Sequence, residues 1–222
     1  MKRAVMLALA SCLLAAPSLS PALFAQALGG DRFEAGIFTD YFGLQRTTPN
    51  INYLGLGARA AFTGCDVSAG MLAEAGKRWP ASLGPAPALV AQDGARTPFA
   101  DHQFDIVTIS AVLHHVPVAE RAAVYRELGR VLKPGGRIYV FEHNPRNPLV
   151  RYVIARTPID ENAILLDEAE VRHGLLDSAH YDIASDYLMF MPPGIIFLGW
   201  LDRLLAWLPL GAQYVVAARK SA

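Results

Sequence analysis

Apolar and polar positions follow two different periods along the chain, and the switch between them is regular from Ala60 onward. Short apolar runs rich in Val, Ile and Phe alternate with longer stretches in which apolar residues recur every three or four positions. A short apolar run is typical of a strand buried on both faces, whereas the longer spacing is typical of a helix packed on one side. The pattern predicts an α/β fold in which helices cover a parallel sheet.

Capping and helix-breaking residues set the limits of the predicted elements. Ser68 is suited to cap the first helix, and Lys133-Pro134-Gly135-Gly136 stops the second, because proline cannot continue a helix and glycine adopts the left-handed cap. The predicted strands are 60–65, 88–92, 104–110, 137–141, 187–191 and 213–217. The predicted helices are 69–78, 118–132 and 167–176, followed by a leucine-rich helix within 193–210.

Length and composition restrict the class of protein. A chain of 222 residues suits a single domain, and 53% hydrophobic against 18% charged residues supplies enough apolar material for a core. Twenty Lys and Arg balance twenty Asp and Glu, and no block of basic residues occurs. Sequence-independent binding of nucleic acid therefore has no electrostatic basis, and we expect small molecules or proteins as partners.

Residues 1–27 have the pattern of a signal peptide. Positive charge at Met1 to Arg3 precedes the apolar run 4–16, and Ala25-Gln26-Ala27 offers small residues at a cleavage spacing. The run is shorter than the roughly 20 residues of a transmembrane helix. Export or membrane attachment is therefore one alternative for this protein.

The segment 193–210 is apolar near the other end of the chain. Its leucines recur at three- and four-residue spacing, which is typical of a helix packed on one side. Packing against the core is the favoured interpretation, and contact with a membrane surface through residues 193–210 is the alternative.

Polar residues follow four of the predicted strands, where an open α/β sheet binds its ligands. A carboxylate at Asp66 can accept both hydroxyls of a ribose, although it can also simply cap a helix. Asp93-Gly94 can meet an adenine amine, or form a turn without a ligand. Ser110 ends the next strand, and Glu142-His143 places an ionisable pair after the last of the four.

The paired His114 and His115 suggest a metal at first sight. Adjacent residues on a helix point apart, however, and no Cys, His or Asp partner stands at ligand spacing. The sequence therefore predicts no metal site.

Several stretches together resemble the class I S-adenosylmethionine-dependent methyltransferases, and in particular a bacterial subgroup of the type 11 methyltransferases. The resemblance covers about 51–217 and is most specific at the Leu-Lys-Pro-Gly-Gly turn. The motifs are Thr63-Gly64-Cys65-Asp66-Val67-Ser68-Ala69-Gly70-Met71-Leu72, Asp93 with Pro98-Phe99, Phe104-Asp105-Ile106-Val107, Leu132-Lys133-Pro134-Gly135-Gly136, Phe141-Glu142-His143-Asn144-Pro145, Asp160-Glu161-Asn162-Ala163 and Trp207-Leu208-Pro209-Leu210-Gly211-Ala212-Gln213-Tyr214.

This resemblance implies a Rossmann-like, doubly wound, mostly parallel sheet whose last strand is antiparallel. It also implies S-adenosylmethionine as the cofactor and, because that compound is made in the cytosol, a cytoplasmic location. Asp66 would hold the ribose, and Asp93 and Gly94 would lie by the adenine. The residues implied for cofactor binding are Gly43, Asp66, Val67, Asp93, Gly94, Ser110 and His115.

The glycine-rich loop of the family should lie about twenty residues before the ribose acid, because a helix and a strand must fit between them. Gly55-Leu56-Gly57 is only eight residues from Asp66, which also speaks against a nicotinamide-dependent oxidoreductase. Counting back reaches Gly43, after an apolar run at 36–42. The predicted organisation is therefore a signal-peptide-like segment 1–27, a divergent first strand and loop 28–50, and a methyltransferase-like domain 51–222.

The predicted reaction is methyl transfer to a small-molecule, lipid or saccharide acceptor. For an acceptor that must lose a proton, the candidate general base is His143, with Glu142 as the alternate and His115 as the third choice. The alternative function is a catalytically impaired remnant, either a pseudoenzyme or a truncated or frameshifted product. This alternative arises because the loop after Gly43 contains Gln45 and Thr47. Their side chains would crowd the backbone at a place where glycine normally lets the cofactor approach.

Overall fold

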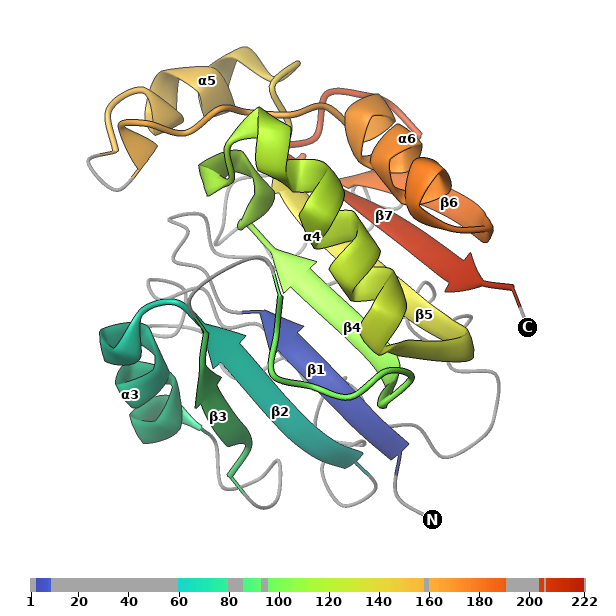
Figure 1. Cartoon of the computed structure of the whole chain (residues 1–222). Helices are drawn as coiled ribbons and strands as arrows, with labels where there is room; N and C mark the ends of the chain where they lie inside the picture. The colour runs from blue at the N-terminus through green and yellow to red at the C-terminus, as the bar shows by residue number, and fades with distance from the viewer. Residues whose placement is uncertain are drawn as a thin grey trace.

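The computed structural model describes residues 3–8, 60–79, 86–92, 96–157, 160–190, 204–205 and 207–221. They form one seven-stranded sheet in the order β3-β2-β1-β4-β5-β7-β6 (Figure 1). The strands are β1 (Arg3–Ala8), β2 (Ala60–Asp66), β3 (Ala88–Ala91), β4 (Phe104–Ser110), β5 (Leu132–His143), β6 (Tyr181–Leu188) and β7 (Gln213–Lys220). The helices in these described ranges are α3 (Ala69–Arg78), α4 (Val118–Val131), α5 (Pro148–Ile154) and α6 (Glu168–Ser178), and a 3-10 turn, η3, spans Leu113–His115.

The sheet is mostly parallel, as the sequence predicts. Strands β3, β2, β1, β4 and β5 pair in parallel, and β7 runs antiparallel to both β5 and β6. The carboxyl ends of β1, β2, β4 and β5 therefore lie along one edge of the sheet (Figure 1). The predicted antiparallel last strand is confirmed by β7.

The strand between β2 and β4 is the main departure from the predicted organisation. Arg3–Ala8, within the segment interpreted as a signal peptide, forms β1 between β2 and β4. The predicted first strand within 28–50 lies outside the described part of the chain and stays a prediction, while residues 3–8 occupy this position between β2 and β4. A short apolar run suits a buried parallel strand as well as a signal peptide, so its composition alone could not separate the two.

Most of the other predicted elements are found within one or two residues of their expected limits. Ser68 caps α3 by accepting a hydrogen bond from the Met71 amide at 3.3 Å, as predicted. Gly135 adopts a left-handed φ of 72° in the turn that leads into the main part of β5. The strand predicted at 187–191 is wrong in its limits, because β6 spans Tyr181–Leu188. Most of the leucine-rich segment 193–210 lies outside the described residues.

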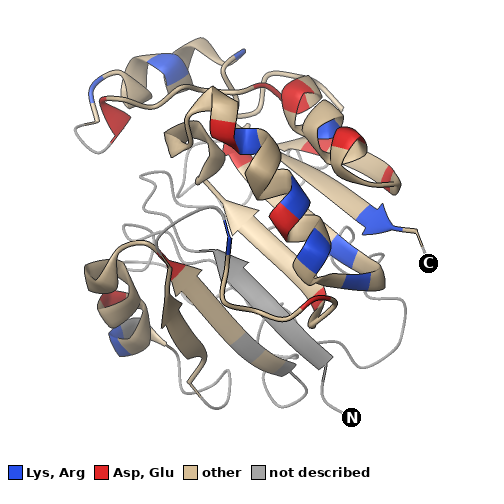
Figure 2. Cartoon of the chain, in the orientation of Figure 1, with Lys and Arg blue, Asp and Glu red and all other residues tan. Residues whose placement is uncertain are grey.

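Helices α4 and α6 lie side by side over one face of the sheet (Figure 1). The core beneath them contains Val107 and Ile109 of β4, Leu128 of α4 and Val140 of β5. Both signs of charge are interspersed along the two helices (Figure 2). Within the described residues, no helix has the length and apolar character needed to cross a membrane.

Candidate functional site

Asp66 ends β2 at the edge where the parallel strands finish. Its side chain is largely buried, and one carboxylate oxygen accepts a hydrogen bond from the Ser68 amide at 2.7 Å. Burial raises the pKa of Asp66, while the amides of Ser68 and Val67 oppose that rise. A buried carboxylate with remaining acceptor capacity at this edge suits the hydroxyls of a ribose.

The other residues predicted to bind a cofactor divide into two groups. Val67 is exposed directly after Asp66, and Ser110 is half-buried at the carboxyl end of β4. Gly43, Asp93 and Gly94 lie outside the described residues. Because β1 occupies 3–8, the connection that follows it starts at Leu9, and the sequence contains no glycine between that residue and Gly29.

The turn after β4 presents the histidine pair. Ala111 takes a left-handed φ of 52°, a conformation that costs free energy for a residue with a Cβ, and its amide donates to the Phe141 carbonyl at 2.8 Å. The 3-10 turn at Leu113–His115 follows immediately. One carboxylate oxygen of Glu142 accepts from the Leu113 amide at 2.7 Å. The last residues of β5 therefore hold the turn that follows β4.

Glu142 also holds the ring of His114. Its second carboxylate oxygen lies 2.6 Å from His114 Nδ1, and both side chains are fully buried. Burial would raise the pKa of Glu142, but His114 and the Leu113 amide hold it below the ordinary value. The ionised carboxylate therefore accepts, and His114 donates from Nδ1. Both oxygens of Glu142 are engaged, an arrangement that suits positioning of His114 and the turn, and its role as an alternate general base stays a prediction.

His143 is also completely buried at the end of β5. Burial lowers its pKa to about 4, so the ring is neutral near pH 7. A general base must reach the proton that it removes, and the buried position of His143 does not favour that role. Of the three predicted bases, His115 alone has an appreciably exposed side chain, at 31%.

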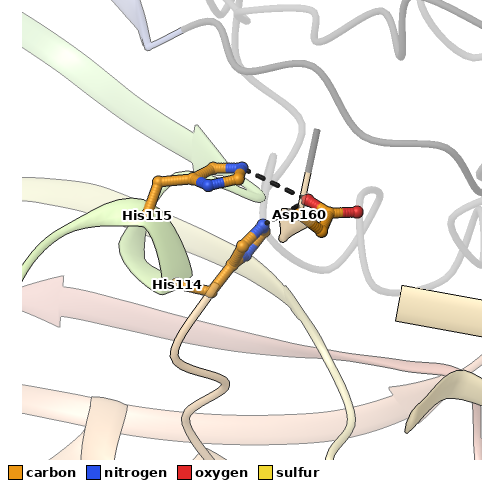
Figure 3. Close-up of side chains that lie close together, drawn as sticks. All are labelled: His114, His115 and Asp160. Carbon is orange, nitrogen blue, oxygen red and sulfur yellow. Dashed lines mark ion pairs between the residues drawn. The ribbon is translucent and has the colours of Figure 1, made fainter. Parts of the chain in front are cut away.

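A loop after α5 brings Asp160 to the histidine pair (Figure 3). The Ile164 amide donates to the His114 carbonyl at 2.7 Å, and Arg121 of α4 donates to the Ile164 carbonyl at 2.5 Å. Asp160 Oδ1 then lies 3.5 Å from His114 Nε2 and 3.4 Å from His115 Nε2.

The structure corrects the geometric reason for excluding a metal. The two rings come from a 3-10 turn and not from an α-helix, and their centroids are only 4.1 Å apart. Asp160, far along the chain, supplies the third group, and one ligand atom from each residue lies within 4.8 Å of the others. Sequence spacing missed Asp160 because the contact is made by the path of the loop; the motif Asp160-Glu161-Asn162-Ala163 was its only signal.

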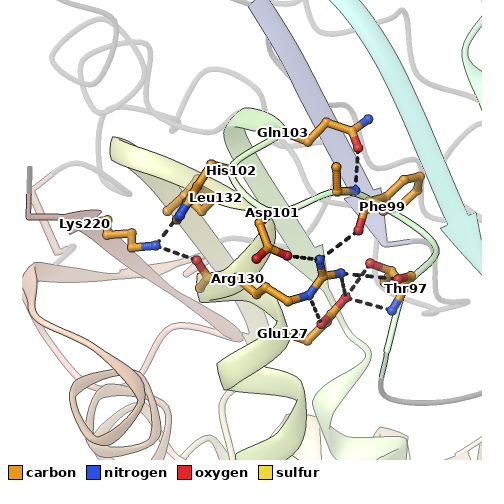
Figure 4. A network of polar contacts seen from close by, with 11 residues as sticks. Thr97, Phe99, Asp101, His102, Gln103, Glu127, Arg130, Leu132 and Lys220 are labelled. Carbon is orange, nitrogen blue, oxygen red and sulfur yellow. Dashed lines mark hydrogen bonds and ion pairs between the residues drawn. The ribbon is translucent and has the colours of Figure 1, made fainter.

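A second polar network fixes the segment that leads into β4 (Figure 4). Glu127 of α4 accepts hydrogen bonds from the amide and hydroxyl of Thr97, at 2.7 and 2.5 Å. Arg130 binds both oxygens of Glu127, at 2.6 and 2.8 Å, and donates to the Phe99 carbonyl at 2.8 Å. The network anchors residues 97–99 to α4, and this segment begins three positions after Gly94 of the predicted adenine segment.

Two asparagines after β5 fix the segment 209–212. Asn144 is buried and donates from Nδ2 to the carbonyls of Pro209 and Gly211, at 3.1 and 2.7 Å. Asn147 caps α5 and donates to the Leu210 carbonyl at 2.7 Å. This segment is therefore attached next to the carboxyl end of β5.

Comparison with known proteins finds similarity over part of the chain. The family model described as a methyltransferase domain matches residues 44–140. The demethylmenaquinone methyltransferase of Corynebacterium kroppenstedtii is 46% identical over 83 residues, which cover 37% of this chain and 32% of that protein. The protein of the same name from Beutenbergia cavernae is 50% identical over 78 residues, covering 35% and 30%. The chain thus spans about a third of the length of these relatives.

Solved structures share the fold at low sequence identity. A SAM-dependent methyltransferase from Archaeoglobus fulgidus aligns with a TM-score of 0.57 and 12% identity, over 98% of this chain and 86% of that one. The magnesium protoporphyrin IX methyltransferase of Synechocystis, solved with bound SAH, aligns with a TM-score of 0.52 and 20% identity, over 77% and 69%.

Proposed function

Because the chain carries a class I S-adenosylmethionine-dependent methyltransferase domain, we propose that it transfers the methyl group of S-adenosylmethionine to a small, lipid-like acceptor. Binding of this cofactor is supported mainly by Asp66, a buried carboxylate at the carboxyl end of β2. When bound, the cofactor supplies a methyl group already activated by its sulfonium. The protein then has to hold the ribose, align the acceptor with the methyl group and remove a proton where the acceptor carries one.

Asp66 would hold the ribose hydroxyls, with Val67 and Ser110 beside it at the same edge. The network of Glu127 and Arg130 would support the adenine side by fixing residues 97–99. The acceptor would approach the partly exposed His115, because Glu142 and His143 are buried behind the turn.

A lipid-like acceptor is supported by two observations. The relatives described above are named demethylmenaquinone methyltransferases, and this chain aligns with about a third of their length. In this chain, large apolar side chains are exposed on α5 and on the segment whose Leu210 carbonyl accepts a hydrogen bond from Asn147, namely Leu149, Tyr152, Trp207 and Leu210. We call these four residues the apolar patch. It is a surface suited to an apolar acceptor or to the lipid that carries one.

The alternative is a methyltransferase-like protein with impaired cofactor binding. The specific observation for it is that no glycine follows β1 before Gly29, where the family places a glycine-rich loop. The expectation of a cytoplasmic location stays a prediction.

Calorimetric titration of the full chain with S-adenosylmethionine and S-adenosylhomocysteine tests the proposal. We expect both to bind, and Asp66→Ala to weaken binding about ten- to hundredfold, the size of a lost hydrogen bond to a charged group. Asp182→Ala, which removes an exposed carboxylate from β6, is the control and should leave binding unchanged. Failure of the folded protein to bind either compound would favour the impaired alternative.

A further inference from the structure

We propose that His114, His115 and Asp160 hold a divalent metal ion of the zinc type, with an open coordination position on the side of His115 that faces solvent. One ligand atom from each side chain lies within 4.8 Å of the others (Figure 3). Two histidines and one carboxylate with an open position are the ligand set of catalytic metal sites. The proposed binding rests on these three side chains, and the role of the ion toward an acceptor rests on the proposed function.

The surroundings of Asp160 give an independent reason for a cation. The residue is only 3% exposed, and neither of its carboxylate oxygens has a hydrogen-bond donor within the described part of the chain. Burying a carboxylate is costly unless it is hydrogen-bonded, paired with a cation or bound to a metal. The Nε2 atoms of His115 and His114 lie 3.4 and 3.5 Å from its carboxylate.

These distances fit shared coordination better than hydrogen bonding. Hydrogen bonds from nitrogen to oxygen measure about 2.7–3.2 Å, shorter than both contacts of Asp160. In a tetrahedral zinc site with bonds of about 2.0–2.1 Å, neighbouring ligand atoms are about 3.3 Å apart. The observed 3.4 and 3.5 Å lie close to this edge length. The two imidazole nitrogens lie within 4.8 Å of each other and would have to come to about 3.3 Å to share one ion.

Glu142 prepares His114 for this role. Its carboxylate accepts from His114 Nδ1 at 2.6 Å, which leaves Nε2 as the nitrogen that faces Asp160. A ligating histidine commonly donates its other ring N–H to a carboxylate, which fixes the ring and increases its basicity. Glu142 is therefore a positioning residue of the proposed site.

The open position has a consequence for the acceptor. His114 and Asp160 are buried, so the ion would be reached past the half-exposed His115. A metal ion there can bind and polarise an oxygen of the acceptor, which favours acceptors with a hydroxyl or phenolic oxygen. In that case His115 is a ligand, and loss of the proton from the acceptor does not require it as a base.

Direct metal titration of the chelator-treated full chain tests the proposal. We expect one equivalent of Zn²⁺ to bind by calorimetry, and one equivalent of Co²⁺ to give the visible absorption of a low-coordinate nitrogen and oxygen site. Asp160→Asn and His115→Gln should each weaken metal binding at least about a hundredfold, and Glu142→Gln about ten- to hundredfold. His173→Gln, an exposed histidine on α6, is the control and should bind as the unchanged protein does.

Two results would overturn the metal site. Either the folded protein binds no zinc, or Asp160→Asn and His115→Gln bind it as tightly as the unchanged chain. Because His115 is half-exposed, His115→Gln should fold even if Asp160→Asn does not, and circular dichroism checks both. Binding of S-adenosylhomocysteine, measured on the same samples, separates the two proposals. A folded chain that binds zinc but not S-adenosylhomocysteine contradicts the proposed function alone. A folded chain that binds S-adenosylhomocysteine but not zinc contradicts the metal site alone.

Discussion

At the scale of single residues, buried charges organise this protein. Asp66, Glu127 and Glu142 are each largely buried, and each accepts hydrogen bonds from backbone amides of a neighbouring loop. A buried carboxylate bonded in this way fixes the loop to its strand or helix, because leaving those partners unpaired would be costly. Asp160 differs because it is buried, yet its carboxylate has no hydrogen-bond donor among the residues that the structure describes.

Replacing Glu127 should destabilise the protein in a pH-dependent way. Burial opposes ionisation of Glu127, but Arg130 and Thr97 together hold its pKa below the ordinary 4.5. A lowered folded-state pKa contributes stability above pH 4.5, and this contribution is lost as the pH falls through the folded value. Glu127→Gln should therefore cost about 1–3 kcal/mol at pH 7 and much less near pH 3, measured by urea unfolding.

The matched control is Glu120→Gln, which removes an exposed carboxylate from the first turn of the same helix. Its effect should stay within about 0.5 kcal/mol at both pH values. An effect of Glu127→Gln that is equal at pH 3 and pH 7 would show that the lost charge is not its cause.

Cys65 should be unreactive in the folded protein. Burial raises the pKa of its thiol to about 12, and the nearby Asp66 and Glu127 carboxylates add to that rise. Because the thiolate is the reactive form, alkylation by iodoacetamide should be far slower in buffer than in urea. Mass spectrometry measures both rates, and rapid alkylation of the folded chain would show that β2 opens readily.

At the scale of elements, the packing of α4 on α6 depends on a small residue. The ring of Tyr125 on α4 lies against Gly174 of α6, where an added Cβ would be 2.1 Å from Tyr125 Cε2. Tyr125 is itself buried in the core, so its ring has little room to move. The glycine lets the two helices approach each other over the sheet.

Gly174→Ala should therefore lower the free energy of unfolding by about 1–3 kcal/mol, because the added methyl overpacks this contact. Gly70→Ala in α3 is the control, since its added Cβ would have its nearest neighbour, Ser68 Oγ, at an ordinary 3.6 Å. That change should raise stability by up to about 1 kcal/mol through helix propensity. Chemical denaturation measures both, and a stable Gly174→Ala protein would show that α6 shifts to accommodate it.

At the scale of the whole molecule, the site is assembled from distant parts of the chain. Strand β1 is an interior strand of the sheet although it precedes the other strands in the sequence, and the loop containing Asp160 returns to the turn after β4. The apolar patch lies after β5, where Asn147 connects α5 to Leu210. Under the proposed function, the apolar patch would receive a lipid-like acceptor.

This arrangement predicts binding to vesicles. The full chain should sediment with lipid vesicles, and Trp207→Ser combined with Leu210→Ser should reduce the bound fraction several-fold, because both side chains are at least half exposed and apolar. Leu176→Ser on α6, which removes a comparably exposed leucine outside the patch, is the control. Equal sedimentation of all three proteins would exclude the patch as a lipid contact.

The sequence by itself determined the regular elements and the chemistry at the strand ends. Periodicity reports how neighbouring positions are buried, so β2, α3, β4 and α4 were predicted within one or two residues. The position of Asp66 followed from the same pattern. Motifs such as Leu132-Lys133-Pro134-Gly135-Gly136 indicated the family on local sequence alone.

The tertiary structure decided which segment fills the centre of the sheet and which side chains meet beyond it. An apolar run such as Arg3–Ala8 suits several roles, and only pairing with β2 and β4 selects one. Glu142 was placed correctly at a strand end, but its burial and its contact with His114 assign it a positioning role. Asp160 meets His114 and His115 because a loop folds back, and no local periodicity encodes the path of a loop.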